Sequence, residues 1–224
     1  MTTLTTRRFD SRDALDAALA ERLARALGVG GASAVMLAGG TTPLPAYRAL
    51  ARRALPHDER LHVLFSDDRY VAADADASNY HQARPLLDAL ALAPARLIRV
   101  HTELSLEAAA EDYERQLHAL LASGARVGLG ILGLGAEGHT ASLFSAADLE
   151  RARAHLAIAV QRPDGLSAVS VTPEFLAQVA EPVFVVAGSG KRAAVRALAA
   201  GDPALLAWRA VQGCPAVALW VWEG

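Results

Sequence analysis

The fold of this chain is decided at VGLGILGLGAEGHTASLF, residues 127–144. The apolar run Val127–Leu132 predicts a buried strand. It ends in a glycine-rich turn, GLGAEG, which His139 follows at once. The next residues, 140–143, favour the start of a helix. A strand, a glycine turn and a helix start together present backbone N–H groups to an anion. A histidine placed there can move a proton onto or off a ligand, so we expect an enzyme or a binder for a small anionic molecule.

The composition indicates a packed core without a large charge excess. The chain has 224 residues, and we expect residues 1–224 to form a single α/β domain. A net charge of −2 argues against nucleic acid or an anionic membrane as the main partner. Cys214 is the one cysteine, which rules out an internal disulfide. There is no signal-peptide pattern and no apolar run near the ~20 residues of a membrane span. We therefore expect a cytoplasmic protein that is a monomer or a weak homodimer.

Strands and helices alternate along the chain. Predicted strands that are apolar on both faces, as buried parallel strands are, lie at 34–38, 127–132 and 183–187. Further strands are expected at 61–65, 97–100, 168–172 and 216–222, and a segment near 155–160 is left unassigned. Helices are expected to begin near Ser11, Pro43, Ser78 or Asn79, Ser105 and Pro173, and after Gly190. This alternation predicts an open, mostly parallel α/β sheet with helices on both faces.

Ligands of such sheets bind beyond the carboxyl ends of the strands. Four motifs follow four predicted strands, namely GGTT at 39–42, SDDR at 66–69, GLGAEGH at 133–139 and GSGK at 188–191. We expect the four to converge on one crevice. The last motif carries Lys191, the only lysine among 22 basic residues. An ammonium group is a compact point charge that suits a phosphate.

Other interpretations of these motifs are weaker. GLGAEG matches the dinucleotide fingerprint, but the acidic residue expected about 20 residues on is missing. GSGKR differs from a phosphate-binding Walker loop, because Arg192 stands where a serine or threonine would hold magnesium. The other histidines show no metal-ligand spacing, and no G-x-S-x-G nucleophile elbow exists. We expect neither a metal nor a cofactor.

Four segments together resemble the 6-phosphogluconolactonases over nearly the whole chain. They are LAGGTTPLPAYRAL, FSDDRYVAADADASNY, GLGAEGHTASLF and VAGSGKRAAVRAL. The motif GHTASLF distinguishes this group from the related glucosamine-6-phosphate deaminases. The resemblance implies a three-layer fold of the deaminase/ribose-phosphate-isomerase type. It also implies hydrolysis of 6-phosphogluconolactone in the pentose phosphate pathway, without a cofactor.

The chain departs from the family pattern at three positions. Glu137 stands for an aspartate and Ser145 for a proline. Ala168 stands where the resemblance leads us to expect a phosphate-contacting arginine. Arg162, in QRPDG, is the residue that would reach in from a nearby loop instead.

The resemblance and the chemistry together assign roles. His139 is expected to take a proton from the water that attacks the lactone, and Glu137 to orient the imidazole. N–H groups of the glycine loop would stabilise the oxyanion. The expected ligands of the sugar hydroxyls and the phosphate are Gly40, Thr41, Thr42, Asp67, Arg69, Arg162 and Lys191.

Two alternatives stay open. One is a sugar-phosphate isomerase or deaminase of the same fold, which needs a further acid or base near Asp67 and Asp68. The other is a non-catalytic sugar-phosphate sensor, which the missing arginine would suit.

Overall fold

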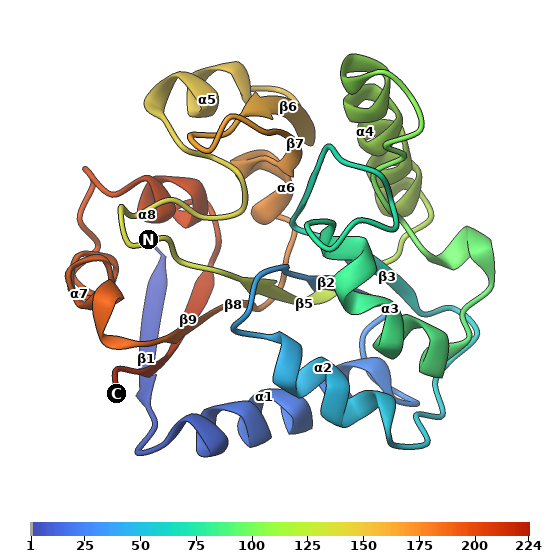
Figure 1. Ribbon diagram of the computed structural model, residues 1–224, viewed down its shortest axis with the longest axis horizontal. Helices are drawn as coiled ribbons and strands as arrows, with labels where there is room; N and C mark the ends of the chain where they lie inside the picture. Colours follow the sequence, from blue (N-terminus) through green and yellow to red (C-terminus); the bar gives the residue numbers. More distant parts are fainter. Residues whose placement is uncertain (1) are drawn as a thin grey trace.

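The computed structural model describes residues 2–224 and contains two β-sheets (Figure 1). The larger sheet has six parallel strands in the order β1-β9-β8-β5-β2-β3, and the smaller has three antiparallel strands in the order β4-β7-β6. The strands are β1 (Thr3–Arg8), β2 (Ala34–Leu37), β3 (His62–Phe65), β4 (Asp67–Arg69), β5 (Val127–Leu132), β6 (Ala157–Gln161), β7 (Ser167–Val171), β8 (Pro182–Ala187) and β9 (Ala216–Trp222).

Helices cover both faces of the six-stranded sheet. They are α1 (Arg12–Leu27), α2 (Leu44–Ala51), α3 (Asn79–Leu90), α4 (Leu106–Ala122), α5 (Ala146–Arg151), α6 (Pro173–Leu176), α7 (Arg192–Ala199) and α8 (Leu206–Val211), with short 3₁₀ turns at Pro94–Arg96 and Ser189–Lys191. Serine side chains cap α1, α3 and α4 where the sequence predicts, because Ser11, Ser78 and Ser105 each accept a backbone N–H of the first turn.

The core has two halves, one on each face of the larger sheet. Helices α1, α2 and α3 pack on one face, while α4, α6, α7 and α8 pack on the other. Successive strand residues alternate between the halves, so Met36 packs with one half while Val35 and Leu37 pack with the other. The expected fold class, a three-layer, open, mostly parallel sheet with helices on both faces, is confirmed.

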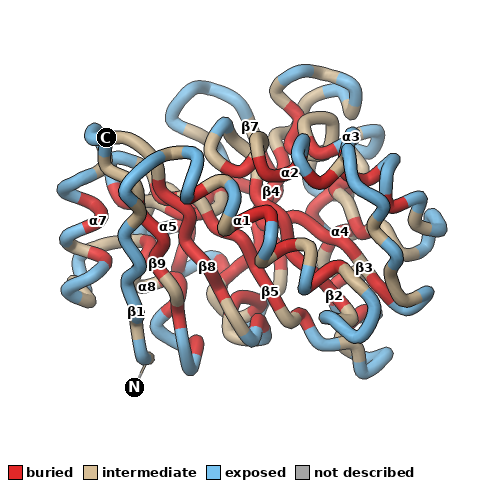
Figure 2. Tube along the Cα trace, turned by 90° about the horizontal axis from the view of Figure 1, so that it is seen from below, coloured by how far each residue is buried: buried red, intermediate tan, exposed pale blue. Residues whose placement is uncertain are grey.

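Strand β1 is absent from the sequence-based prediction. It pairs in parallel with β9 at the edge of the sheet, and most of its residues are exposed, in contrast to the buried strands β5 and β8 (Figure 2). Its threonines are β-branched and favour a strand. Because they are polar, they leave no apolar pattern from which a strand is usually inferred.

The predicted strand at 97–100 is wrong. The chain there forms only an isolated bridge between Val63 and Leu97, with the Ile98 N–H donating to the Val63 carbonyl at 2.9 Å. It then turns away, because the Thr102 N–H donates to the carbonyl of Val100. Its apolar residues Ile98 and Val100 are buried in the core without a strand.

The smaller sheet carries three of the four residues of the SDDR motif. Only Ser66 separates β3 from β4, and its carbonyl accepts the N–H of Val171 at 2.9 Å, so the chain passes directly from one sheet to the other. The antiparallel register places Asp67 opposite Ser170 and Arg69 opposite Ala168. Within residues 2–224, no helix has the length and apolar character needed to cross a membrane.

Candidate active site

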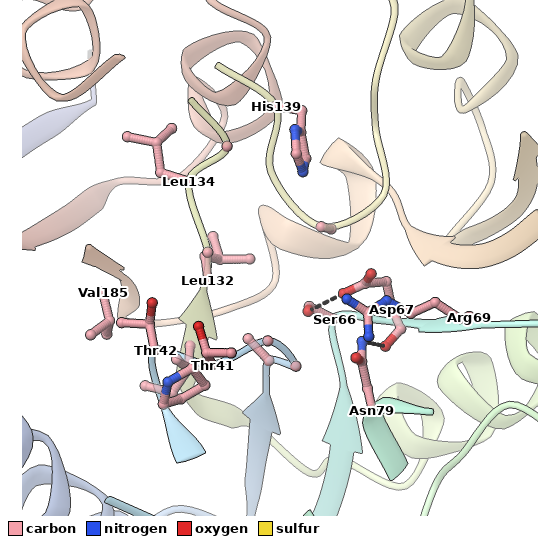
Figure 3. Close-up of a pocket in the computed structure, with 18 of the residues that line it drawn as sticks. Thr41, Thr42, Ser66, Asp67, Arg69, Asn79, Leu132, Leu134, His139 and Val185 are labelled. Carbon is pink, nitrogen blue, oxygen red and sulfur yellow. Dashed lines mark hydrogen bonds between the residues drawn. The ribbon is translucent and has the colours of Figure 1, made fainter. Parts of the chain in front are cut away.

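A cavity of about 310 Å³ lies at the carboxyl ends of four neighbouring strands, β8, β5, β2 and β3 (Figure 3). The loops that follow these strands are the four motifs of the sequence, and they meet here because parallel strands end at the same edge of the sheet. The candidate residues that line the cavity are Gly40, Thr41, Thr42, Asp67, Arg69, His139, Arg162 and Lys191. Glu137 lies outside the lining and reaches the cavity through His139.

His139 is held by a carboxylate and by a glycine. Its Nδ1 lies 2.6 Å from Oε1 of Glu137. A hydrogen bond from the Glu137 backbone N–H, then the neighbouring His139 and Lys191, lower the pKa of the Glu137 carboxyl. An ionised carboxylate only accepts hydrogen bonds, so Nδ1 carries the proton and Nε2 is left as the basic nitrogen. A side chain at Gly135 would place its Cβ 2.1 Å from Nδ1, so only glycine leaves room for the ring.

The predicted helix start at 140–143 is wrong. Thr140 donates its hydroxyl to the carbonyl of Gly133 at 2.8 Å, and Ala141 has a left-handed φ of 48°. The segment is therefore a turn, and α5 begins only after Ser145, which caps it. Two of the glycine N–H groups are not available to a ligand, because those of Gly135 and Gly138 donate hydrogen bonds within the turn.

Asp67 lies at the centre of a buried network. Oδ1 accepts the hydroxyl of Ser66 and Oδ2 that of Ser142, each at 2.7 Å. The Ser142 hydroxyl in turn accepts Nη1 of Arg162 at 3.3 Å. A neutral hydroxyl thus links a cation and an anion that both line the cavity. The Asp67 backbone carbonyl accepts Nδ2 of Asn79 at 2.8 Å (Figure 3).

Asp68 has a different structural role from Asp67. Its carboxylate accepts the backbone N–H groups of Asn79 at 2.6 Å and Tyr80 at 3.1 Å, which are orphan donors at the start of α3. Burial raises its pKa to about 6, although these hydrogen bonds act in the opposite direction. Asp68 is therefore a helix-capping residue and does not line the cavity.

The GGTT loop approaches α3 closely. A Cβ at Gly39 would lie 1.8 Å from Oδ1 of Asn79, so the missing side chain lets the buried amide pack against the loop. Gly40 has a φ of 83°, a left-handed conformation that favours glycine, and its N–H donates to Gln82. Thr41 and Thr42 then face the cavity across from His139 (Figure 3).

Three cations line the cavity. Arg69 is anchored by Nη1, which donates to the carbonyl of Ala77 at 2.7 Å. Burial lowers the pKa of Lys191, while the charge of Glu137 raises it. Within residues 2–224, no carboxylate lies within 4.0 Å of the Lys191 ammonium, so its charge stays available. Such a cluster suits a multiply charged anion.

Arg162 reaches the face of the small sheet on which Ala168 lies. Ala168 is 0% exposed and points to the same side as Ser170, since alternate residues of a strand share a face. The Ser170 hydroxyl accepts the N–H of Ser142, the residue that also contacts Arg162. Arg162 therefore stands close to where the resemblance places the missing arginine.

Sequence reasoning missed Ser66, Asn79 and Ser142 as parts of the site. All three are polar and almost fully buried. Each lies in one of the segments that resemble the family, but spacing alone does not reveal which serine or amide turns inward. Within residues 2–224, no group of three or more His, Cys, Asp or Glu side chains is placed to hold a metal ion.

Comparisons with known proteins agree with the resemblance. A 6-phosphogluconolactonase of Thermotoga maritima is 39% identical over 132 residues, which are 58% of this chain and 57% of the relative. A 6-phosphogluconolactonase of Synechocystis is 36% identical over 180 residues, or 78% and 74% of the two chains. A solved 6-phosphogluconolactonase structure from Thermotoga maritima superposes with a TM-score of 0.77 at 28% identity, covering 99% of both chains.

The family model described as "Glucosamine-6-phosphate isomerases/6-phosphogluconolactonase" matches residues 8–220. This match confirms the family expected from the four motifs. Because it extends over nearly the whole length, the chain belongs to the family of glucosamine-6-phosphate isomerases and 6-phosphogluconolactonases.

Proposed function

We propose that this protein hydrolyses 6-phospho-D-glucono-1,5-lactone to 6-phosphogluconate, a reaction of the pentose phosphate pathway. One observation carries the proposal: the paired imidazole of His139 opens onto a cavity that also holds Lys191, Arg69 and Arg162. A base and a cluster of cations are what an anionic lactone requires. Relatives named 6-phosphogluconolactonase support the same conclusion.

The chemistry follows from the protonation of His139. Its free Nε2 removes a proton from water while the water oxygen bonds to C1 of the lactone. The carbonyl oxygen becomes an oxyanion, and its collapse breaks the bond from C1 to the ring oxygen. The imidazolium returns its proton to that oxygen, which leaves a free hydroxyl and a carboxylic acid at C1. The acid then loses its proton to solvent, so the final product is a carboxylate. Glu137 stabilises the imidazolium between the two steps.

The remaining lining residues hold the substrate. Lys191, Arg69 and Arg162 neutralise the phosphate, and Asp67 accepts a sugar hydroxyl. Gly40, Thr41 and Thr42 also line the cavity, with the two threonines across from His139, and they offer further hydrogen bonds. Binding energy from the phosphate then positions C1 for attack. No step of this chemistry requires a cofactor.

The isomerase or deaminase alternative finds less support. It needs a further acid or base near Asp67 and Asp68. Asp68 is occupied as the cap of α3. The two serine hydroxyls that donate to Asp67 favour its role as a hydrogen-bond acceptor, which suits a sugar hydroxyl better than proton transfer. The net charge of −2 supports a small-molecule substrate over nucleic acid or membrane. We also propose a cytoplasmic protein that is a monomer or weak homodimer, which sedimentation can test.

The test is direct. The purified protein is mixed with freshly generated lactone at mildly acidic pH, where spontaneous hydrolysis is slow, and product formation is compared with a blank lacking enzyme. His139→Asn serves as the matched variant. A rate equal to the blank would contradict the proposed function, whereas an active wild type with an equally active His139→Asn would contradict only the role of His139.

A further inference from the structure

The ring of Phe144 contacts two residues of the cavity wall. Its centroid is 4.4 Å from that of the His139 imidazole, with the rings tilted by 44°. The guanidinium of Arg162 lies 5.1 Å from the same centroid, within the range of a cation–π interaction. Phe144 does not line the cavity itself. Phe144 therefore contacts the expected base and one of the expected phosphate ligands, but it is not placed to contact the substrate itself.

The backbone of Phe144 is fixed by the first turn of α5. Its N–H donates to Oδ2 of Asp148 at 3.1 Å, and the same oxygen accepts the Ser145 hydroxyl at 2.8 Å. The Asp148 N–H returns a hydrogen bond to the Ser145 oxygen at 3.1 Å. This reciprocal cap, with Asp148 buried, fixes the backbone from which the ring of Phe144 projects.

Behind Phe144 there is room for Arg162 to leave the site. A second cavity of about 550 Å³ is lined by Phe144, Arg162 and the carboxylate residues Glu107 and Asp148. Arg151 also lines this cavity and already pairs with Asp148 at 2.7 Å. A guanidinium released from the ring would therefore find space there and the carboxylate of Glu107. Arg162 is otherwise tied to Ser142 by one long hydrogen bond, and to Asp164 of its own loop.

We propose that Phe144 is a positioning residue that holds the His139 imidazole and the Arg162 guanidinium at the cavity at the same time. The proposal rests on the proposed lactonase function. Loss of the ring releases both neighbours. A displaced base slows the chemical step, and a displaced cation weakens substrate binding. One residue thus controls kcat through His139 and KM through Arg162.

Phe144→Leu tests this, because leucine keeps an apolar side chain and removes the ring. We expect KM to rise roughly 3- to 30-fold as the cation–π contact is lost. We expect kcat to fall roughly 10- to 100-fold as the base loses its alignment. Phe144→Tyr, which keeps the ring, should retain most of both. Equal kinetics for a folded Phe144→Leu and the wild type would overturn the proposal.

A matched control exists elsewhere in the chain. Phe9 is also half-buried between an aromatic ring and a guanidinium, with Trp220 at 5.6 Å and Arg7 at 4.6 Å between centres, and it does not line the cavity. Phe9→Leu should lower the denaturation midpoint without changing kcat or KM. If it impairs catalysis as much as Phe144→Leu does, the effect is general destabilisation and the proposal fails.

A double variant separates the effect on KM through Arg162 from the effect on kcat through His139. In an Arg162→Ala background, Phe144→Leu should no longer raise KM but should still lower kcat. Additive effects on KM would show that the ring does not act through Arg162. A readout without substrate is the NMR resonance of the His139 ring protons, identified by its loss in His139→Asn. Unchanged resonances in Phe144→Leu would overturn the placement, even if the wild type proved inactive on the lactone.

Discussion

Arg162→Ala is the change that best tests how this chain holds phosphate without an arginine at position 168. The side chain is 14% exposed, and three of its N–H groups are engaged. Nε and Nη2 donate to Asp164, and Nη1 donates to Ser142. Because a guanidinium has five N–H donors, two remain for a ligand in the cavity. Arg162 is therefore placed to give the phosphate a charge-assisted hydrogen bond.

The expected loss follows from that geometry. A hydrogen bond to a charged group contributes roughly 1.5–3 kcal/mol. A hydrogen bond from Arg162 lowers the pKa of Asp164, so a full negative charge sits beside the guanidinium and weakens its pull on the phosphate. We therefore expect about 1.5 kcal/mol, which corresponds to a roughly tenfold rise in KM. The value of kcat should change little, since Arg162 is not expected to touch C1.

The assay compares phosphorylated and unphosphorylated ligands. KM for the lactone and the dissociation constant of 6-phosphogluconate should rise together in Arg162→Ala, while gluconolactone hydrolysis should be much less affected. Arg153→Ala is the control, because Arg153 is exposed and pairs with Glu150 on the surface. Ala168→Arg should not tighten binding, and it should destabilise the fold because Ala168 is fully buried.

Two results would refute the reasoning. If Arg162→Ala weakens both classes of ligand equally, the side chain serves the structure of the loop and not the phosphate. If Arg162→Ala is silent while Ala168→Arg tightens binding of 6-phosphogluconate, the site holds phosphate weakly and the missing arginine was not replaced.

Three further predictions concern single residues. His139→Asn should lower kcat for lactone hydrolysis by about 10²–10⁴ with an unchanged fold, and near wild-type activity would remove it from the mechanism. Lys191→Ala should weaken binding of 6-phosphogluconate more than that of gluconate. Because burial lowers the pKa of Lys191, wild-type calorimetry should show this affinity falling as the pH rises, below the ordinary lysine value of 10.5. Asp68 binds its proton more tightly in the folded chain than in the unfolded one, so its contribution to stability is present at about pH 4 and lost as the pH rises through about 6. Urea unfolding should show the stability of wild type relative to Asp68→Asn increasing by up to about 3 kcal/mol from pH 7 to pH 4, and a constant difference would contradict the burial argument.

The sequence predicts the parallel sheet and the meeting of the four loops well, for one physical reason. Strands buried on both faces are apolar throughout, as in VMLA and VGLGIL. Once the strands are parallel, the loops that follow them share an edge. The positions of His139, Lys191 and Asp67 around one cavity then follow from topology.

The parts that the sequence does not predict depend on distant partners. Strand β4 is three charged residues long and has no periodicity, and it becomes a strand only by pairing with β7, about a hundred residues later in the chain. The turn at 140–143 contains residues that allow a helix. It stays open because Thr140 and Ser142 find better partners in Gly133 and Asp67.

The departures from the family pattern are linked through the same loop. Glu137 is one methylene longer than the expected aspartate, yet its carboxylate still reaches Nδ1 of His139. Ser145, in place of a proline, supplies the hydroxyl that caps α5 and so fixes the backbone of the preceding Phe144. The ring of that residue contacts the Arg162 guanidinium, which we expect to replace the arginine missing at position 168. A proline at 145 could not form this cap, because it has no hydroxyl. Ser145→Pro should therefore raise KM through Arg162, and an unchanged KM in a folded variant would show that the cap does not reach the site.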